Sequence, residues 1–238
     1  SEAVDVETGD ILIRTTVGDT LFETITHGGG LVSVSTNVVT INPAGTFASS
    51  TGYYLVIPST FFDDASSNDY AGFSTKTVLN FTSADSVAPT LASSSPADNA
   101  TGVAEGSNIV LTFSEVVDRE SGNITIKKTS DNSTIEAIAV TDSKITGTGT
   151  NVITINPTAN LASSTEFYVL VDGAAFDDTS SNSYAGISST TALSFTTSDT
   201  VSPTLASSSP ADGSTGIAVS SNIILNFSEA VDVETGNI

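Results

Sequence analysis

The sequence predicts an all-β protein made of tandem repeats, and three observations lead to this fold class. Whole phrases return 114 residues later, since VAPTLASSSPADNATGV at 87–103 becomes VSPTLASSSPADGSTGI at 201–217. Apolar and polar residues alternate over short stretches such as SNIVLTF at 107–113, which is the period of a β-strand. The gaps between these stretches hold Gly, Asn, Asp, Ser and Pro, which are turn residues. No segment keeps the 3.6-residue period of a helix.

The repeats divide the chain into three parts, here called the first, second and third repeat. Residues 88–201 form a complete second repeat. The first repeat, residues 1–87, contains no counterpart of the first quarter of that unit. The third repeat, residues 202–238, is a copy of that first quarter. Because the sequence contains no Met, we expect it to be a piece of a longer polypeptide or a processed product.

About seven strands are expected in each repeat of about 114 residues. In the second repeat they fall at 89–95, 107–113, 122–128, 134–141, 151–155, 166–171 and 191–197. This number of short strands indicates an immunoglobulin-like β-sandwich, so the chain is expected to be a tandem array of such sandwiches. Tyr168 and its copy Tyr54 stand where a tyrosine corner would lie.

The missing quarter has a consequence for the first repeat. Without it, the apolar strand faces have no cover, and neighbouring strands expose unpaired backbone. These faces are formed by Ile11, Ile13, Val39, Ile41, Val56 and Phe81. We therefore expect residues 1–87 to fold only with a segment equivalent to 203–227 packed on them. That segment would come from a neighbouring copy or from another part of a longer chain.

Composition excludes several classes of partner. The net charge of −21 should repel nucleic acid and anionic lipid. There is no cysteine, and no apolar run approaches the length of a membrane span. We expect no nucleic-acid partner and no membrane insertion by this segment. The expected partners are further copies of the same repeat, in cis or as neighbouring subunits.

The sequence does not predict an enzyme. His27 is the single histidine, so no Ser/His/Asp set can recur in each repeat. The GGG at 28–30 precedes a strand rather than a helix and is not a phosphate loop. The neighbouring acids Asp177 and Asp178 recur at 63–64, and duplicated catalysis along a repeat array is improbable.

Three recurring acidic clusters could instead bind calcium, which takes six to eight oxygen ligands. The first cluster is Asp118 and Glu120, with copies at Asp5 and Glu7 and at 232 and 234. The second cluster is Asp178 and Asn182, with copies at Asp64 and Asn68. The third cluster lies at the repeat junctions and is Asp199 and Asp212, with copies at Asp85 and Asp98. The alternative is turn capping, because Asp, Asn and Ser bond to their own backbone in turns. Capping is favoured for the first two clusters. At a junction, a calcium ion would stiffen the joint and neutralise facing acids, so both interpretations stay open there.

Three motifs together resemble the bacterial Ig-like repeat of S-layer proteins and large tandem-repeat surface adhesins. They are Pro–Ala–Asp at 96–98, TFSE at 112–115 and SFTT at 194–197, and the resemblance covers the whole chain. It implies a stalk or layer outside the cell and no enzymatic activity. The chain departs from the family at DDTSSN, 177–182, where the family usually has an Asp–x–x–Gly–Asn turn.

The expected function is a non-catalytic structural extender of a bacterial extracellular repeat protein. The alternative is a subunit of an extracellular fibre, assembled by head-to-tail strand complementation. A lectin-like module is disfavoured, because the chain has no Trp and only 7% aromatic residues.

Overall fold

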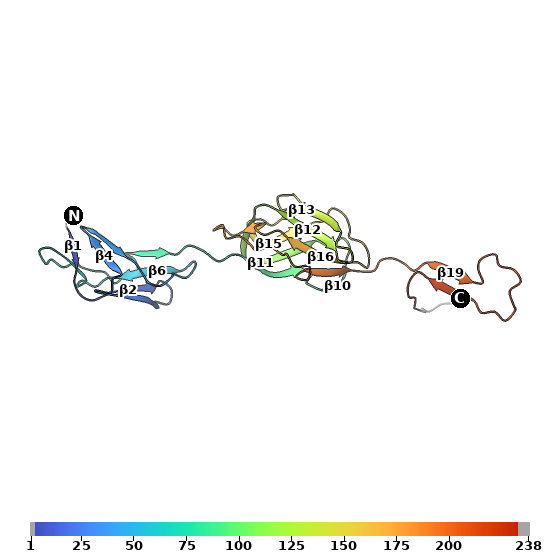
Figure 1. The fold of residues 1–238 in the computed structure, drawn as a ribbon, viewed down its shortest axis with the longest axis horizontal. Helices are drawn as coiled ribbons and strands as arrows, with labels where there is room; N and C mark the ends of the chain where they lie inside the picture. Colours follow the sequence, from blue (N-terminus) through green and yellow to red (C-terminus); the bar gives the residue numbers. More distant parts are fainter. Residues whose placement is uncertain (1–2, 233–238) are drawn as a thin grey trace. The chain divides into compact units, whose positions relative to one another are not determined.

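The computed structural model describes residues 3–232, which form strands, turns and loops (Figure 1). Contacts divide the chain into two units. The first is Ser1–Thr90 with Glu115–Asp118 and Phe176–Ala185, and the second is Leu91–Ser114, Arg119–Ala175 and Gly186–Ile238. Within residues 3–232 no helix is long and apolar enough to cross a membrane. The prediction of an all-β chain of sandwich repeats is confirmed.

The second repeat contains a two-sheet sandwich. One sheet has the order β10-β18-β16-β12-β13 and the other has the order β14-β15-β11-β17, with β9 paired to β11. The strands are β9 (Leu91–Ser95), β10 (Ala100–Val103), β11 (Ile109–Arg119), β12 (Asn123–Lys128), β13 (Thr134–Ala139), β14 (Ile145–Thr146), β15 (Thr150–Ile155), β16 (Glu166–Val171), β17 (Phe176–Asp177) and β18 (Ser194–Thr197).

The alternating pattern of β11 places its apolar residues inside, as the sequence predicts. Ile109, Leu111 and Phe113 are at most 1% exposed. The nearly continuous apolar run of β16 is buried at Phe167, Tyr168 and Val169, as expected for a central strand.

Three short strands of this repeat were not predicted, namely β10, β14 and β17. Their sequences are rich in turn residues or only two residues long. β10 reads ATGV and becomes a strand by pairing in parallel with β18. The sequence shows only the local turn preference of these residues. Pairing with a distant strand overrides that preference.

The first repeat has the same arrangement with strands missing. Its main sheet has the strand order β3-β2-β6-β8. Two further sheets, β4-β5 and β1-β7, have two strands each. The strands are β1 (Val4–Val6), β2 (Asp10–Thr15), β3 (Leu21–Thr26), β4 (Val32–Ser35), β5 (Val38–Ile41), β6 (Gly52–Val56), β7 (Phe62–Asp64) and β8 (Asn80–Thr82). The main sheet corresponds strand by strand to β13-β12-β16-β18, without a counterpart of β10.

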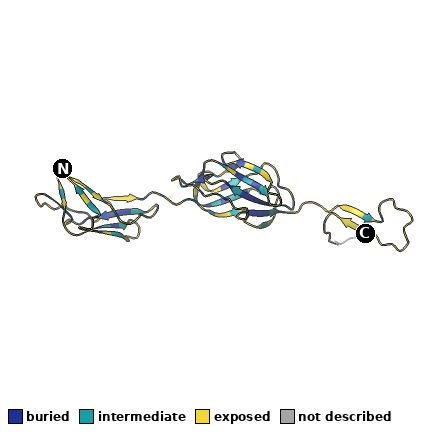
Figure 2. Cartoon of the chain, viewed as in Figure 1, coloured by how far each residue is buried: buried dark blue, intermediate teal, exposed yellow. Residues whose placement is uncertain are grey.

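The prediction that residues 1–87 fold only under a covering segment is wrong in its strict form. The first repeat keeps its strands and a buried cluster that includes Ile11, Ile13, Tyr53 and Phe61. The closure of the sandwich is nevertheless incomplete. The second sheet is split into β4-β5 and β1-β7, and β8 is exposed along its whole length (Figure 2).

The third repeat contributes one hairpin to the described residues, β19 (Leu205–Ser209) and β20 (Ile224–Phe227). Every residue of β20 is exposed. Residues 214–217, the copies of β10, are not a strand here. We attribute this to the missing partner, because β10 exists only as an addition to β18.

Equivalent leucines in the two repeats give a test of this difference. Leu193 is 1% exposed and its copy Leu79 is 45% exposed. Leu193→Ala should cost about 2–5 kcal/mol of unfolding free energy, because it leaves a cavity in a closed core. Leu79→Ala should cost less than about 1 kcal/mol, because that side chain already contacts water. Denaturant unfolding in dilute solution measures both, and equal costs would contradict the incomplete closure of the first repeat.

Candidate metal centre

The Asp–x–Ser–x–Asn clusters are turn caps in both repeats. Asp178 accepts hydrogen bonds at Oδ1 from the backbone N–H groups of Ser180 and Asn182, both at 2.8 Å, and at Oδ2 from Asn182 Nδ2 at 2.8 Å. Asp64 makes the same three contacts with Ser66 and Asn68, again at 2.8 Å. These contacts account for the turn geometry at DDTSSN, although it lacks the glycine usual in the family.

The first acidic cluster lies at the end of β11 and in the turn to β12. The backbone N–H of Glu120 donates to the carbonyl of Ala175 at 3.0 Å, and the copy Glu7 donates to Phe61 at 2.9 Å. Asp5 faces Asp63 across the β1-β7 pair. Asp118, Glu120, Asp5 and Glu7 do not gather with further acids into a three-ligand group in the described part of the chain. The copy Asp232 is exposed, and the copy at 234 lies outside the described residues.

The junction acids Asp85 and Asp199 have equivalent local roles. Asp85 Oδ1 accepts from the N–H of Val87 at 3.0 Å and from the Ser49 hydroxyl at 2.7 Å. Asp199 Oδ1 accepts from Val201 and Ser163 at 3.0 and 3.3 Å.

The prediction for the junctions also includes Asp98 and Asp212. Asp98 Oδ1 accepts from the backbone N–H of Ser194 at 2.9 Å and so ties the start of the second repeat to β18. Its copy Asp212 is exposed. Among the described residues, the group of acids that could hold a metal ion includes neither Asp98, Asp199 nor Asp212.

Three carboxylates do come together inside the first unit. Single carboxylate oxygens of Asp85, Glu115 and Asp178 lie within 4.8 Å of one another. The side-chain amide of Asn182 donates to the backbone carbonyl of Asp85 at 3.3 Å and holds the segment at residue 85 against this group. We call Asp85, Glu115 and Asp178 the acidic triad.

Sequence reasoning missed Glu115. It belongs to TFSE, which was read as part of a family motif and of a strand rather than as a ligand. The available signal was the recurrence of the acid at the same position of the repeat, as Glu2 and Glu229.

Within the acidic triad the ionised form is disfavoured at Glu115, whereas hydrogen bonds from Val87 and Ser49 lower the pKa of Asp85. Burial raises the pKa of Glu115, and the charges of Asp178 and Asp85 raise it further. Burial also opposes ionisation of Asp178, but the hydrogen bonds from Asn182 and Ser180 outweigh it and lower its pKa. The ion pairs found among residues 3–232 are Arg14–Asp19 and Lys144–Glu136, and neither involves the triad.

The neighbouring Asp177 adds to this acidic region. Its Oδ1 is buried and has no hydrogen-bond partner. Burial, then the charges of Asp178 and Asp118, raise its pKa. Hard oxygen ligands of this kind suit Ca²⁺, which accepts carboxylates together with carbonyl groups and water in flexible geometry.

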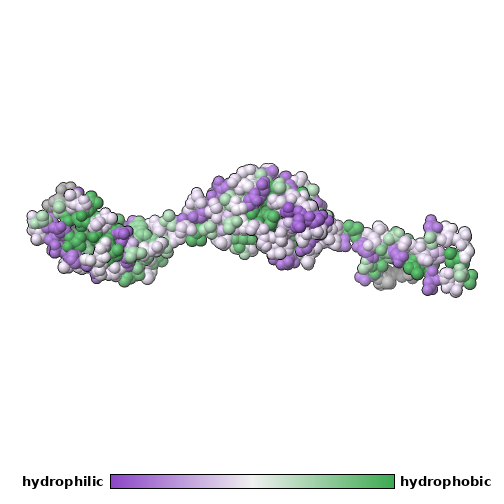
Figure 3. Space-filling model, viewed as in Figure 1, coloured by the Kyte–Doolittle hydropathy of each residue, from purple (hydrophilic) through white to green (hydrophobic). Residues whose placement is uncertain are grey.

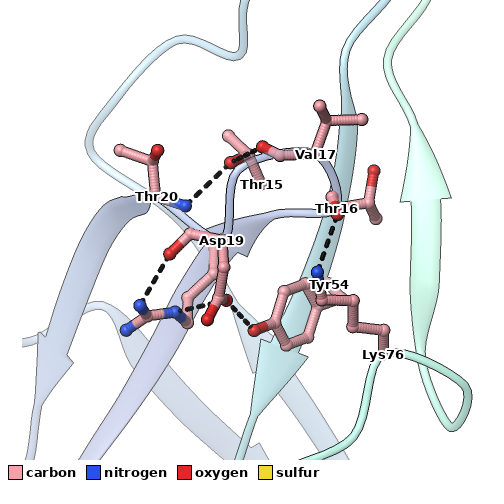
Figure 4. Close-up of polar contacts among 8 residues, drawn as sticks. Thr15, Thr16, Val17, Asp19, Thr20, Tyr54 and Lys76 are labelled. Carbon is pink, nitrogen blue, oxygen red and sulfur yellow. Dashed lines mark hydrogen bonds and ion pairs between the residues drawn. The ribbon is translucent and has the colours of Figure 1, made fainter.

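A second polar group, in the first repeat, is structural (Figure 4). The hydroxyl of Tyr54 donates to Asp19, whose carboxylate also pairs with Arg14 Nε at 2.9 Å. Lys76 donates to the carbonyl of Thr16 at 2.8 Å. The loop that carries Asp19 is thereby fixed against β6.

The copy of this group corrects the prediction of a tyrosine corner. Tyr168 donates to the side chain of Asn132 at 3.0 Å. Asn132 is the copy of Asp19, and it lies 36 positions upstream of Tyr168. A tyrosine corner instead uses a backbone group a few residues upstream. In both repeats the tyrosine anchors the loop after β2 or β12.

The chain belongs to the bacterial Ig-like domain family, which it matches over residues 1–83, 85–197 and 199–238. Domains of this family are typically structural or surface domains of extracellular proteins and are typically non-enzymatic. No curated protein matches the chain. Among solved structures it is similar to CopC from Methylosinus trichosporium OB3b, with 17% identity, 48% of this chain and 97% of that chain covered, and a TM-score of 0.35.

The Asp19–Asn132 difference gives a pH prediction. Hydrogen bonds from Tyr54 and Arg14 lower the pKa of Asp19 below its ordinary value of 3.8. Its contribution to stability is therefore fully present above that ordinary value and is lost as the pH falls through the folded-state pKa. Asp19→Asn copies the second repeat and removes this titration. Between about pH 5 and pH 2, the melting temperature of the first repeat should fall less steeply in the variant, and parallel curves would contradict the assignment.

Proposed function

We propose that this chain is a non-catalytic structural extender of a bacterial extracellular repeat protein, such as an adhesin or an S-layer-type surface protein. The observation that carries the proposal is the use of the same side chains for the same local tasks in successive repeats. Asp64 and Asp178 cap equivalent turns, and Tyr54 and Tyr168 anchor equivalent loops. Side chains engaged in these contacts maintain the shape of a repeat rather than take part in a reaction.

The acid–base alternative is disfavoured by the same contacts. A catalytic pair at Asp177 and Asp178 would need both carboxylates to face a substrate. Asp178 is 6% exposed, and both of its oxygens accept hydrogen bonds from its own turn. The net charge of −21 supports a role in which the surface stays hydrated and repels anionic polymers.

Small-angle scattering tests the extender proposal. A compact 238-residue chain has a radius of gyration of about 18 Å. An extender should give at least about twice that value in dilute solution, because its domains are strung along the chain. A radius of gyration near the compact value would overturn the proposal.

We further propose that the acidic triad binds Ca²⁺ and thereby stabilises the first unit. The three carboxylates supply negative charge that no ion pair in the described part of the chain offsets. Asp85 precedes the second repeat in sequence, whereas Glu115 and Asp178 belong to it. A cation held by all three would therefore fix the segment around residue 85 to β11 and to the turn after β17.

Glu115→Gln should have effects of opposite sign with and without calcium. The pKa of Glu115 is raised above 4.5, so in the folded state its charge is lost preferentially. Its stabilising contribution is present at low pH and is lost as the pH rises through the raised pKa. In chelator at neutral pH the variant should therefore melt higher than wild type, by about 1–4 °C. In millimolar Ca²⁺ it should melt lower, because one ligand is gone.

Glu120→Gln is the matched control. It removes the same charge five positions away, at an exposed residue outside the triad. Melting curves of wild type and both variants, in chelator and in Ca²⁺, complete the test. If wild type shows no calcium response, the triad is not a calcium site, and if Glu120→Gln behaves as Glu115→Gln does, the effect is general charge reduction.

A further inference from the structure

The loop between β3 and β4 of the first repeat holds the single histidine of the chain, followed by three glycines. His27, Gly28, Gly29 and Gly30 are all exposed. Gly28 and Gly30 have φ angles of 76° and 78°, and a Cβ atom added to either would meet no other atom within 4 Å. The loop therefore presents an imidazole and a run of backbone amides to solvent.

The second repeat shows that the fold does not require these residues. Val140 takes the place of His27, because the two backbone N–H groups donate to the carbonyls of equivalent glycines, Gly122 at 3.0 Å and Gly9 at 3.3 Å. Val140 is buried, and the residues after it are Thr, Asp and Ser instead of three glycines. The core packing and turn capping that explain the repeated residues do not explain the THGGG sequence.

The backbone groups of this loop are available to a ligand. Among residues 3–232, the N–H of Gly28 donates no hydrogen bond, and the carbonyl oxygens of Gly28 and Gly29 accept none. The N–H of Gly29 donates to the carbonyl of Thr26 at 3.2 Å, at the long end of the usual range. A ligand that takes both amides therefore breaks one weak contact and no strand pairing.

We propose that His27 and the two glycines after it form a Cu²⁺ site. The imidazole Nδ1 of His27 anchors the ion. The backbone nitrogens of Gly28 and Gly29 bind it after losing their protons, and the carbonyl oxygen of Gly29 is the fourth ligand. Both amide protons pass to solvent when the ion binds, as protons do whenever a metal takes a deprotonated ligand.

The chemistry of the loop selects Cu²⁺ over other divalent ions. Three nitrogens and one oxygen in a plane are a coordination typical of Cu²⁺. A structural zinc site instead takes four side-chain ligands, and this loop supplies one. Ca²⁺ takes oxygen ligands and does not compete for the imidazole. The net charge of −21 adds a general attraction for cations.

Glycine makes the chelate possible. Two consecutive amide planes must turn toward the same ion, and a residue without a Cβ atom reaches the backbone angles that this requires at little cost. The open space beside Gly28 leaves room for the ion and its ligands.

The experiment titrates the whole 238-residue chain with Cu²⁺ in a non-coordinating buffer. Hydrophilic residues lie at the surface of each repeat (Figure 3), so weak binding of Cu²⁺ to carboxylates is the expected background. Millimolar Ca²⁺ in the buffer occupies those carboxylates. The first equivalent of Cu²⁺ should give an electron paramagnetic resonance spectrum with three nitrogen ligands, and His27→Asn should abolish this spectrum.

Two further variants separate the backbone ligands from the loop as a whole. Gly29→Pro keeps His27 but has no N–H to ionise at position 29, so the spectrum should lose nitrogen ligands. Gly30→Asn is the matched control and should bind Cu²⁺ as wild type does. The nitrogen of Gly30 is not a ligand, and Asn tolerates a positive φ angle.

Three outcomes overturn the inference. A first equivalent of Cu²⁺ that His27→Asn binds equally well is held by carboxylates. A spectrum with a single nitrogen ligand shows the imidazole acting without the backbone amides. A chain that binds no Cu²⁺ has no such site. None of these outcomes bears on the extender proposal, which scattering decides, or on the acidic triad, which is tested with Ca²⁺.

Discussion

The fold depends on the burial of one long strand, β11, between the strands of the second sheet. Its apolar side chains Ile109, Leu111, Phe113 and Val117 are all buried, and its 11 residues pair with β9, β15 and β17. A sheet that faces a core must have continuous hydrogen bonding and continuous apolar cover, because an open edge leaves both unsatisfied. Where only the end of this strand is present, as in β1, the second sheet breaks into two pieces.

The repeats act as internal controls for one another. Leu79 and Leu193 are the same residue type in nearly the same local sequence, yet one is exposed and the other is buried. Local sequence therefore does not set their burial, and the presence of a covering segment does. The same reasoning explains why ATGV is a strand at 100–103 while STGI at 214–217 is not.

The fold class, the repeat length and most strand positions follow from the sequence, because alternation and turn residues are local signals. β10 and β17 could not be predicted, because they owe their conformation to partners far away in the chain. The same limit applies to the candidate site. Asp85 and Asp178 were singled out as acids, but their meeting with Glu115 depends on three segments that lie apart in the sequence. The role of Tyr168 was misjudged because its partner, Asn132, lies in another loop.

The acids of this chain fall into two electrostatic classes, which differ in the direction of their pKa shifts. Asp19, Asp64 and Asp131 accept hydrogen bonds from nearby donors, and these bonds lower their pKa values. They are stable as anions and need no other partner. Burial and neighbouring acids instead raise the pKa values of Glu115 and Asp177. A carboxylate in such surroundings lowers its free energy either by taking up a proton or by gaining a cation. The proposed calcium site rests on the second of these, because Ca²⁺ takes carboxylate ligands in flexible geometry.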